Sequence, residues 1–92
     1  MVPLLELKTE KLEIVEIEVD EGAAAAGRLV EEVEVPESAR IISVVRDGRA
    51  CIALGELRLQ AGDQVIAILE PGGEDALRRA LVEGPRQLFP PA

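Results

Sequence analysis

Two arginines enclose a run of β-branched residues near the middle of the chain. Residues 40–46 read RIISVVR, and Arg49 follows a predicted turn. A guanidinium can hold a phosphate through two parallel hydrogen bonds, and Ile or Val side chains can flank a flat base. Cationic and apolar groups converge here, so this strand is the candidate site for a small anionic ligand. The alternative is that these arginines are surface residues beside glutamates.

Acidic residues form a second candidate site earlier in the chain. Glu16, Glu18 and Asp20 are spaced by two residues, so on a strand they project from one face. Ca²⁺ takes several oxygen ligands, which makes this face a candidate cation site. The spacing of a calcium-binding loop is absent, and the alternative is a solvated strand face. We therefore expect no metal cofactor.

Catalytic machinery is poorly represented. The chain has no His, which removes the commonest general base and the commonest transition-metal ligand. The hydroxyl residues therefore have no His to activate them, and the sequence contains neither a G-x-S-x-G motif nor a complete dinucleotide-binding fingerprint. Cys51 lies in an apolar run, so we expect a buried and inert thiol. The sequence predicts a protein that is not an enzyme.

The composition indicates one small acidic domain. Ninety-two residues bury only a modest core, which must be aliphatic because Phe89 is the only aromatic residue. Self-association would supplement such a core, and we expect a homodimer. The net charge of −8 comes from the first 37 residues, whereas the remainder is neutral. This argues against nucleic acid as a partner, and the lack of a long apolar run argues against membrane insertion. We expect a cytoplasmic location.

The first strand has an irregular apolar pattern. Residues 1–10 are expected to be a lead-in or the stub of a linker, and residues 11–19 alternate as a strand does. Leu12 and Ile14 share one face, whereas Val15, Ile17 and Val19 share the other. Either a β-bulge near Ile14 or a strand that is apolar on both faces, one of them turned towards a partner, accounts for this slip.

The remaining patterns predict an α+β fold. We expect a helix at 23–32, a turn at Pro36, and strands at 40–46 and 49–54 joined by the Asp47-Gly48 pair that suits a type I′ turn. A short strand at 57–59, a strand at 64–69, a helix at 74–82 and a flexible tail at 84–92 follow. The expected order is β-α-β-β-β-β-α, in one domain over residues 11–83. It would form a small antiparallel or mixed sheet with two helices.

In their order and spacing these segments resemble the TrkA-C domain, the C-terminal lobe of RCK-type regulatory subunits of potassium channels and transporters. The resemblance covers residues 11–83. It departs from the family pattern at Ala53, where Pro is frequent, and at Leu57, where Thr is frequent, and the usual nucleotide-binding lobe is not among these 92 residues. The matching positions are Gly22, Ala26-Gly27-Arg28, Glu32-Val33, Val35-Pro36, Ile41-Ile42, Arg46, Gly48, Leu59, Gly62-Asp63 and Val65.

The resemblance implies a homodimer with a regulatory role in potassium or other cation transport. Its partner would be a membrane channel or transporter subunit, or a nucleotide-binding regulatory lobe. Some family members bind a cyclic dinucleotide at the dimer interface through an Ile-rich patch and an Arg. By position, the corresponding ligand-binding candidates are Arg40, Ile41, Ile42 and Arg46. The alternative is a purely structural oligomerisation module with no small-molecule ligand.

Overall fold

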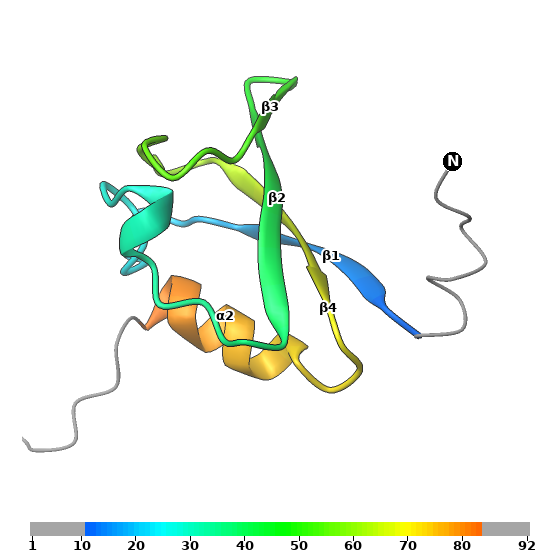
Figure 1. The fold of residues 1–92 in the computed structure, drawn as a ribbon. Coiled ribbons are helices and arrows are strands. Elements are labelled where there is room, and N and C mark those ends of the chain that lie inside the picture. Colours follow the sequence, from blue (N-terminus) through cyan, green and yellow to red (C-terminus); the bar gives the residue numbers. More distant parts are fainter. Residues whose placement is uncertain (1–10, 84–92) are drawn as a thin grey trace, which may run out of the picture.

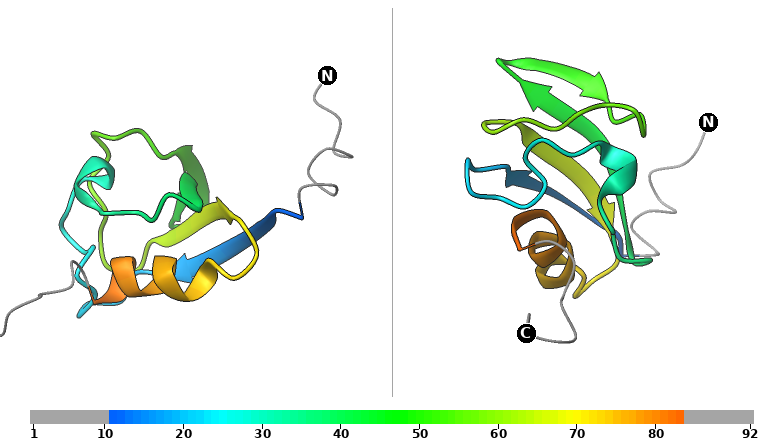
Figure 2. Two further views of the ribbon diagram at one scale, coloured as in Figure 1. Left: turned by 60° about the horizontal axis from the view of Figure 1, so that its bottom comes forward. Right: turned by 90° about the vertical axis from the view of Figure 1, so that its left-hand side faces the viewer.

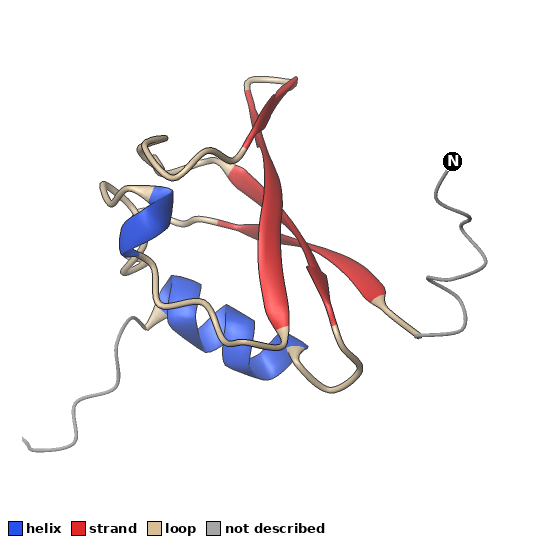
Figure 3. Ribbon diagram, in the orientation of Figure 1, coloured by secondary structure: helices blue, strands red, loops and turns tan. Residues whose placement is uncertain are grey.

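Four strands form one antiparallel sheet with the order β1-β4-β2-β3 (Figures 1 and 3). The computed structural model describes residues 11–83, so the expected lead-in and tail lie outside the described residues. The elements in chain order are β1 (Glu13–Glu18), the 3₁₀ helix η1 (Val30–Glu32), β2 (Ala39–Arg46), β3 (Arg49–Ile52), β4 (Gln64–Leu69) and α2 (Glu74–Val82). The fold is therefore α+β, and the described residues contain one α-helix where two were expected.

The edge strand β1 pairs with β4 along its whole length. Its pairing with β4 runs without interruption from Glu13 opposite Leu69 to Glu18 opposite Gln64. The predicted bulge near Ile14 is therefore wrong, and Ile14 and Ile17 lie on opposite faces of the strand. Ile17 is buried in the core, whereas the side chain of Ile14 on the opposite face is 63% exposed.

A bulge occurs instead in β2. Its register with β4 shifts between Ile41 and Ser43, which leaves Ile42 as the extra residue. Ile41 and Val44 are consequently both buried although they are three residues apart. The hairpin that follows is of the predicted type I′ form, because both turn residues have positive φ, 52° at Asp47 and 77° at Gly48.

The prediction of a helix at 23–32 is wrong. The helical part of this stretch is the short 3₁₀ helix η1 (Val30–Glu32). The amides of Ala24 and Ala25 donate to the carbonyls of Val82 and Leu81, and the amide of Gly27 donates to Leu59. These long-range bonds replace the local bonds that a helix needs, and Gly27 has a φ of +87°. The predicted strand at 57–59 is also absent, because this stretch makes a single isolated bridge between Arg58 and Leu29.

The core lies on one side of the sheet, where α2 packs against it (Figure 2). Leu77 and Leu81 of α2 are fully buried together with Leu59 from the irregular segment that precedes β4. The opposite side is named the outer face. From the strand registers it consists of Ile14, Glu16, Glu18, Arg40, Ser43, Val45, Ala50, Ile52, Gln64, Ile66 and Ile68.

Candidate functional site

Arg40 lies at the N-terminal end of β2 with its side chain exposed. It stands opposite Ile68 of β4, and within residues 11–83 it has no ion-pair partner. Two open depressions meet at this residue. The larger has a volume of about 300 Å³ and is lined by Val30, Val35, Ala39, Arg40, Ile41, Ala53 and Gly55. The smaller has a volume of about 170 Å³ and is lined by Leu12, Glu37, Ser38, Ala39, Arg40, Ile68, Leu69 and Glu70.

Gly55 lines the larger depression and lies close to η1. A Cβ atom at this position would lie 2.8 Å from Oε1 of Glu31, so a larger residue would collide with η1 unless Glu31 moved. The Gly55 carbonyl also accepts a bond from the amide of Glu31 at 3.0 Å. Apolar side chains and Gly55 form most of the wall of this depression, and Arg40 supplies its positive charge.

Arg46 forms an ion pair with Asp63. Its Nε and Nη2 atoms donate to the two carboxylate oxygens of Asp63, each at 2.8 Å, and Nη2 also donates to the carbonyl of Arg58. Asp63 is 1% exposed and is the only buried charged residue among those described. It accepts a third bond from the amide of Gln60 at 2.8 Å. This bidentate pair joins β2 to the turn before β4.

The ion pair shifts both groups towards their charged forms. The hydrogen bond from Arg46 lowers the pKa of Asp63, although burial of the carboxylate opposes the shift, and the Gln60 amide lowers this pKa further. The hydrogen bond to Asp63 likewise raises the pKa of Arg46. Asp63 therefore stays ionised through the ordinary pH range.

The lowered pKa of Asp63 predicts an acid-sensitive fold. An unfolded Asp titrates near pH 4, so the stabilisation is complete above that pH and is lost as the pH falls through the lower, folded pKa. We expect the free energy of unfolding, measured by urea titration from pH 7 to pH 2, to fall more steeply below pH 4 in the native chain than in Asp63→Asn. Parallel curves for the two proteins would contradict this assignment.

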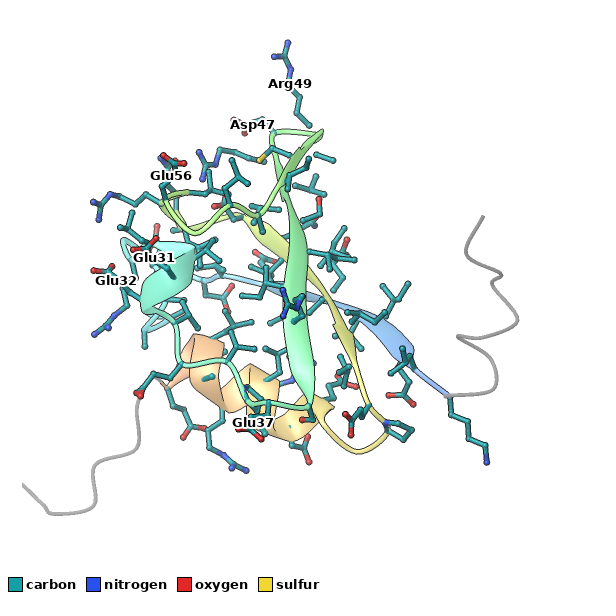
Figure 4. The ribbon with its side chains drawn as sticks, in the orientation of Figure 1. Glu31, Glu32, Glu37, Asp47, Arg49 and Glu56 are labelled. Atoms are coloured by element: carbon teal, nitrogen blue, oxygen red, sulfur yellow. The ribbon has the colours of Figure 1, made fainter. Side chains whose placement is uncertain are left out.

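The structure separates the predicted ligand-binding residues. Arg40 and Ile42 are exposed, but Ile41 is 8% exposed and belongs to the core. Arg46 lies on the core side of the sheet, opposite to Arg40. Arg49 lies at the tip of the hairpin beside Asp47 (Figure 4). It pairs with Arg46, at the opposite end of β2 from Arg40. Of the four predicted residues, Arg40 is the one that combines positive charge with an open depression.

The acidic residues are dispersed. Glu16, Glu18 and Asp20 are exposed, and within residues 11–83 no group of His, Cys, Asp or Glu side chains is placed to hold a metal ion. Glu31 and Glu32 lie on η1, away from Glu37 (Figure 4).

The expectation of a buried Cys51 is wrong. This residue lies on the short edge strand β3, all four residues of which are exposed. Its thiol contacts the carbonyl of Val44 at 3.4 Å. β3 lies at the edge of the sheet, and the apolar side chains around Cys51 are exposed to solvent.

Sequence reasoning missed the walls of the larger depression and the partner of Arg46. Val30, Val35 and Ala53 lie on irregular segments whose position relative to β2 has no local signature. Asp63 is one of the positions that match the family pattern, but its role as a buried partner depends on strand register. Arg46 and Asp63 are 17 residues apart in the sequence, and their spacing gives no signal of this pairing.

Residues 11–83 form a small α+β domain with one four-stranded antiparallel sheet. The TrkA-C domain family model matches residues 14–82, and the chain belongs to this family. Over 58 residues, 63% of this chain and 13% of the relative, it is 34% identical to the Trk system potassium uptake protein TrkA homolog of Archaeoglobus fulgidus. Over 82 residues, 89% of this chain and 37% of the relative, it is 24% identical to TrkA of Mycobacterium tuberculosis. The chain thus spans less than two fifths of the length of these curated relatives.

Solved structures share the fold. The RCK C domain of the potassium transport protein KtrA in complex with cyclic diadenosine monophosphate has a TM-score of 0.69 and 23% identity, covering 85% of this chain and 92% of that chain. The RCK_C domain dimer of S. agalactiae BusR in complex with c-di-AMP has a TM-score of 0.58 and 19% identity, covering 72% and 90%. No helix among residues 11–83 has the length and apolar character needed to cross a bilayer.

Proposed function

We propose that this chain is a non-enzymatic, cytoplasmic regulatory domain of a potassium transport system that binds a cyclic dinucleotide as a homodimer. Membership of the TrkA-C family supports the regulatory assignment, and the curated relatives are Trk potassium uptake proteins. The structures of KtrA and BusR described above carry c-di-AMP, which supports this class of ligand. The partner would be a channel or transporter subunit or a nucleotide-binding lobe.

The observation that carries the proposal is the exposed Arg40 at the junction of the two depressions, which forms no ion pair with any residue of 11–83. Its guanidinium can hold a phosphate, and the apolar wall formed by Val30, Val35 and Ala53 suits the face of a base. A cyclic dinucleotide has two equivalent halves, so each protomer of a dimer would bind one phosphate and one base. A volume of about 300 Å³ for each protomer is consistent with half of such a ligand.

The ligand would act by population shift. A molecule that contacts both protomers favours the arrangement of the dimer in which both contacts are made, in proportion to its differential affinity for that arrangement. The attached transport subunit would then respond to the geometry of the dimer. This mechanism needs binding chemistry alone, consistent with the lack of His in the chain.

Calorimetry with cyclic diadenosine monophosphate tests the ligand. We expect Arg40→Ala to weaken binding by about 10- to 100-fold, because a hydrogen bond to a charged group contributes about 1.5–3 kcal/mol. Arg79→Ala is the matched control, since Arg79 is exposed on α2 away from the depressions. If Arg40→Ala and Arg79→Ala bound the ligand with equal affinity, Arg40 would not belong to the binding site. If the native chain gave no binding heat, the proposal that it binds a cyclic dinucleotide would be wrong.

A second candidate function is a purely structural oligomerisation module. The exposed isoleucines of the outer face favour it, because they provide an association surface that needs no ligand. This alternative predicts a native chain that self-associates and shows no thermal shift or calorimetric signal with cyclic dinucleotides.

A further inference from the structure

The two edges of the sheet differ in how they are protected. β1 forms one edge and carries Glu13, Glu16 and Glu18, and charged side chains on an edge strand oppose pairing with a further strand. β3 forms the other edge and is the outermost strand on that side (Figure 2). Its sequence over Arg49–Ile52 contains no acidic residue, and all four residues are exposed. The β3 edge is therefore the one at which another strand can add.

The main chain of β3 presents free hydrogen-bonding groups along this edge. The type I′ turn makes Arg46 and Arg49 a hydrogen-bonded pair, and such pairs alternate with non-bonded ones along an antiparallel ladder. The N–H groups of Ala50 and Ile52 and the carbonyl of Ala50 therefore point away from β2. None of these three groups has a partner among the described residues, whereas the Ile52 carbonyl accepts a bond from the amide of Leu54 at 2.9 Å. An extended segment could bond to all three.

Exposed apolar side chains gather at the end of the same edge. Ile52 is 74% exposed and Leu54 is 56% exposed. Ile42, the extra residue of the β2 bulge, is 39% exposed, and its carbonyl accepts a bond from the amide of Ala53 at 3.3 Å, which places it next to the end of β3. Single exposed isoleucines need no explanation, but a group of them beside an open strand edge indicates an interaction surface.

The charges at the start of β3 indicate the chemistry of the occupant. Arg49 is exposed and stands directly opposite Arg46, and like charges at such a pair are destabilising. Arg46 is neutralised by Asp63, whereas Arg49 forms no ion pair within the described part of the chain, even with the nearby Asp47. Since Arg49 and Ile52 project from opposite faces of β3, a strand with carboxylates on one face and apolar residues on the other is complementary to both.

We propose that the β3 edge is a docking site for an extended segment of a partner protein, which alternates acidic and apolar residues and adds as a fifth strand. The main chain of that segment bonds to Ala50 and Ile52, and one of its carboxylates lies beside Arg49. Arg40 lies at the opposite end of β2 from Arg49, so this site is separate from the proposed ligand site. The inference goes beyond the proposed function and does not depend on it.

Nuclear magnetic resonance of the complete, ligand-free chain, titrated with a blocked hexapeptide of alternating Glu and Val, is the test. We expect saturable binding below about 1 mM, as is typical of a small interface. The largest shift changes and new protection from hydrogen exchange should occur at the amides of Ala50 and Ile52. A peptide of alternating Lys and Val should bind at least about tenfold more weakly, because it places like charges beside Arg49.

Two variants test the main chain and the charge separately. Ala50→Pro removes an N–H that points away from β2, so the hairpin ladder stays intact, which circular dichroism verifies. Arg49→Glu reverses the charge and leaves the main chain unchanged, so it tests the site even if the proline variant fails to fold. Each should weaken binding of the Glu-Val peptide at least about tenfold. Arg79→Glu is the matched control, because it makes the same change of charge on the exposed side of α2.

Four results would overturn the docking site as proposed. The first is no binding of the Glu-Val peptide at millimolar concentration, and the second is equal binding by the native chain, Ala50→Pro and Arg49→Glu. The third is equal affinity for the Lys-Val peptide. The fourth is protection of the Ala50 and Ile52 amides that rises with protein concentration when no peptide is present, because a second copy would then occupy the edge. A chain that binds the peptide but no cyclic dinucleotide would contradict the proposed function alone.

Discussion

Replacing Asp63 by Ala is expected to lower the free energy of unfolding by about 3–5 kcal/mol, because removing one partner of a buried ion pair leaves the other uncompensated. Asp63 is 1% exposed and accepts three hydrogen bonds, two of them from Arg46. The side chain of Arg46 is 32% exposed and keeps some contact with water, which favours the lower half of that range. Urea unfolding monitored by circular dichroism measures the change.

The surface pair between Arg78 and Glu74 provides the matched control. Its N–O distance is also 2.8 Å, but both side chains are about half exposed and lie one turn apart on α2. Glu74→Ala should therefore lower the free energy of unfolding by less than about 1 kcal/mol. A double-mutant cycle between Asp63→Ala and Arg46→Ala should show strong coupling. Equal costs at Asp63 and Glu74 would contradict the structural role assigned to the buried pair.

Leu59→Ala is expected to lower the free energy of unfolding by about 2.5–5 kcal/mol, although the residue belongs to no helix or strand. Its side chain is fully buried, and its amide and carbonyl are bonded to the carbonyl of Arg28 and the amide of Gly27, each at 2.8 Å. The backbone is thus fixed on both sides, so the structure cannot collapse readily into the space that the substitution leaves.

Leu54→Ala in the same irregular segment is the control for Leu59→Ala. Leu54 is 56% exposed, and the same deletion there should cost less than about 1 kcal/mol. Thermal and urea unfolding of both variants measure the difference. If Leu54→Ala lowered the free energy of unfolding as much as Leu59→Ala, the assignment of Leu59 to the core would be wrong.

The elements with strong local signals were predicted well. The Asp47-Gly48 turn, the apolar pattern of β4 and the charges of α2 each depend on neighbours in sequence, so the hairpin and the last helix follow from the residues alone. The first helix failed because alanine has high intrinsic helix propensity, whereas the amides of Ala24 and Ala25 bond to the end of α2. Long-range bonds of this kind have no local signature.

The candidate site was predicted in part for the same reason. The exposure of Arg40 follows from its place at the start of an apolar strand. The bulge at Ile42 changes which residues of β2 share a face, and it turns Arg46 to the core side, next to Asp63. Neither the bulge nor the register between β2 and β4 can be predicted from the residues alone. The sequence therefore placed Arg40 and Arg46 in one site, whereas in the structure Arg40 lines the depressions and Arg46 pairs with Asp63.

The bonds between Ala24–Ala25 and the last turn of α2 bear on how the chain acquires its structure. The carbonyls of Leu81 and Val82 would otherwise be unpaired helix ends, and here the first third of the chain satisfies them. Because contacts so distant in sequence slow folding, completion of this domain must await the synthesis of its final helix. Amide hydrogen exchange at residues 24 and 25 should therefore follow the opening of α2, so that the two ends of the domain open as one cooperative unit.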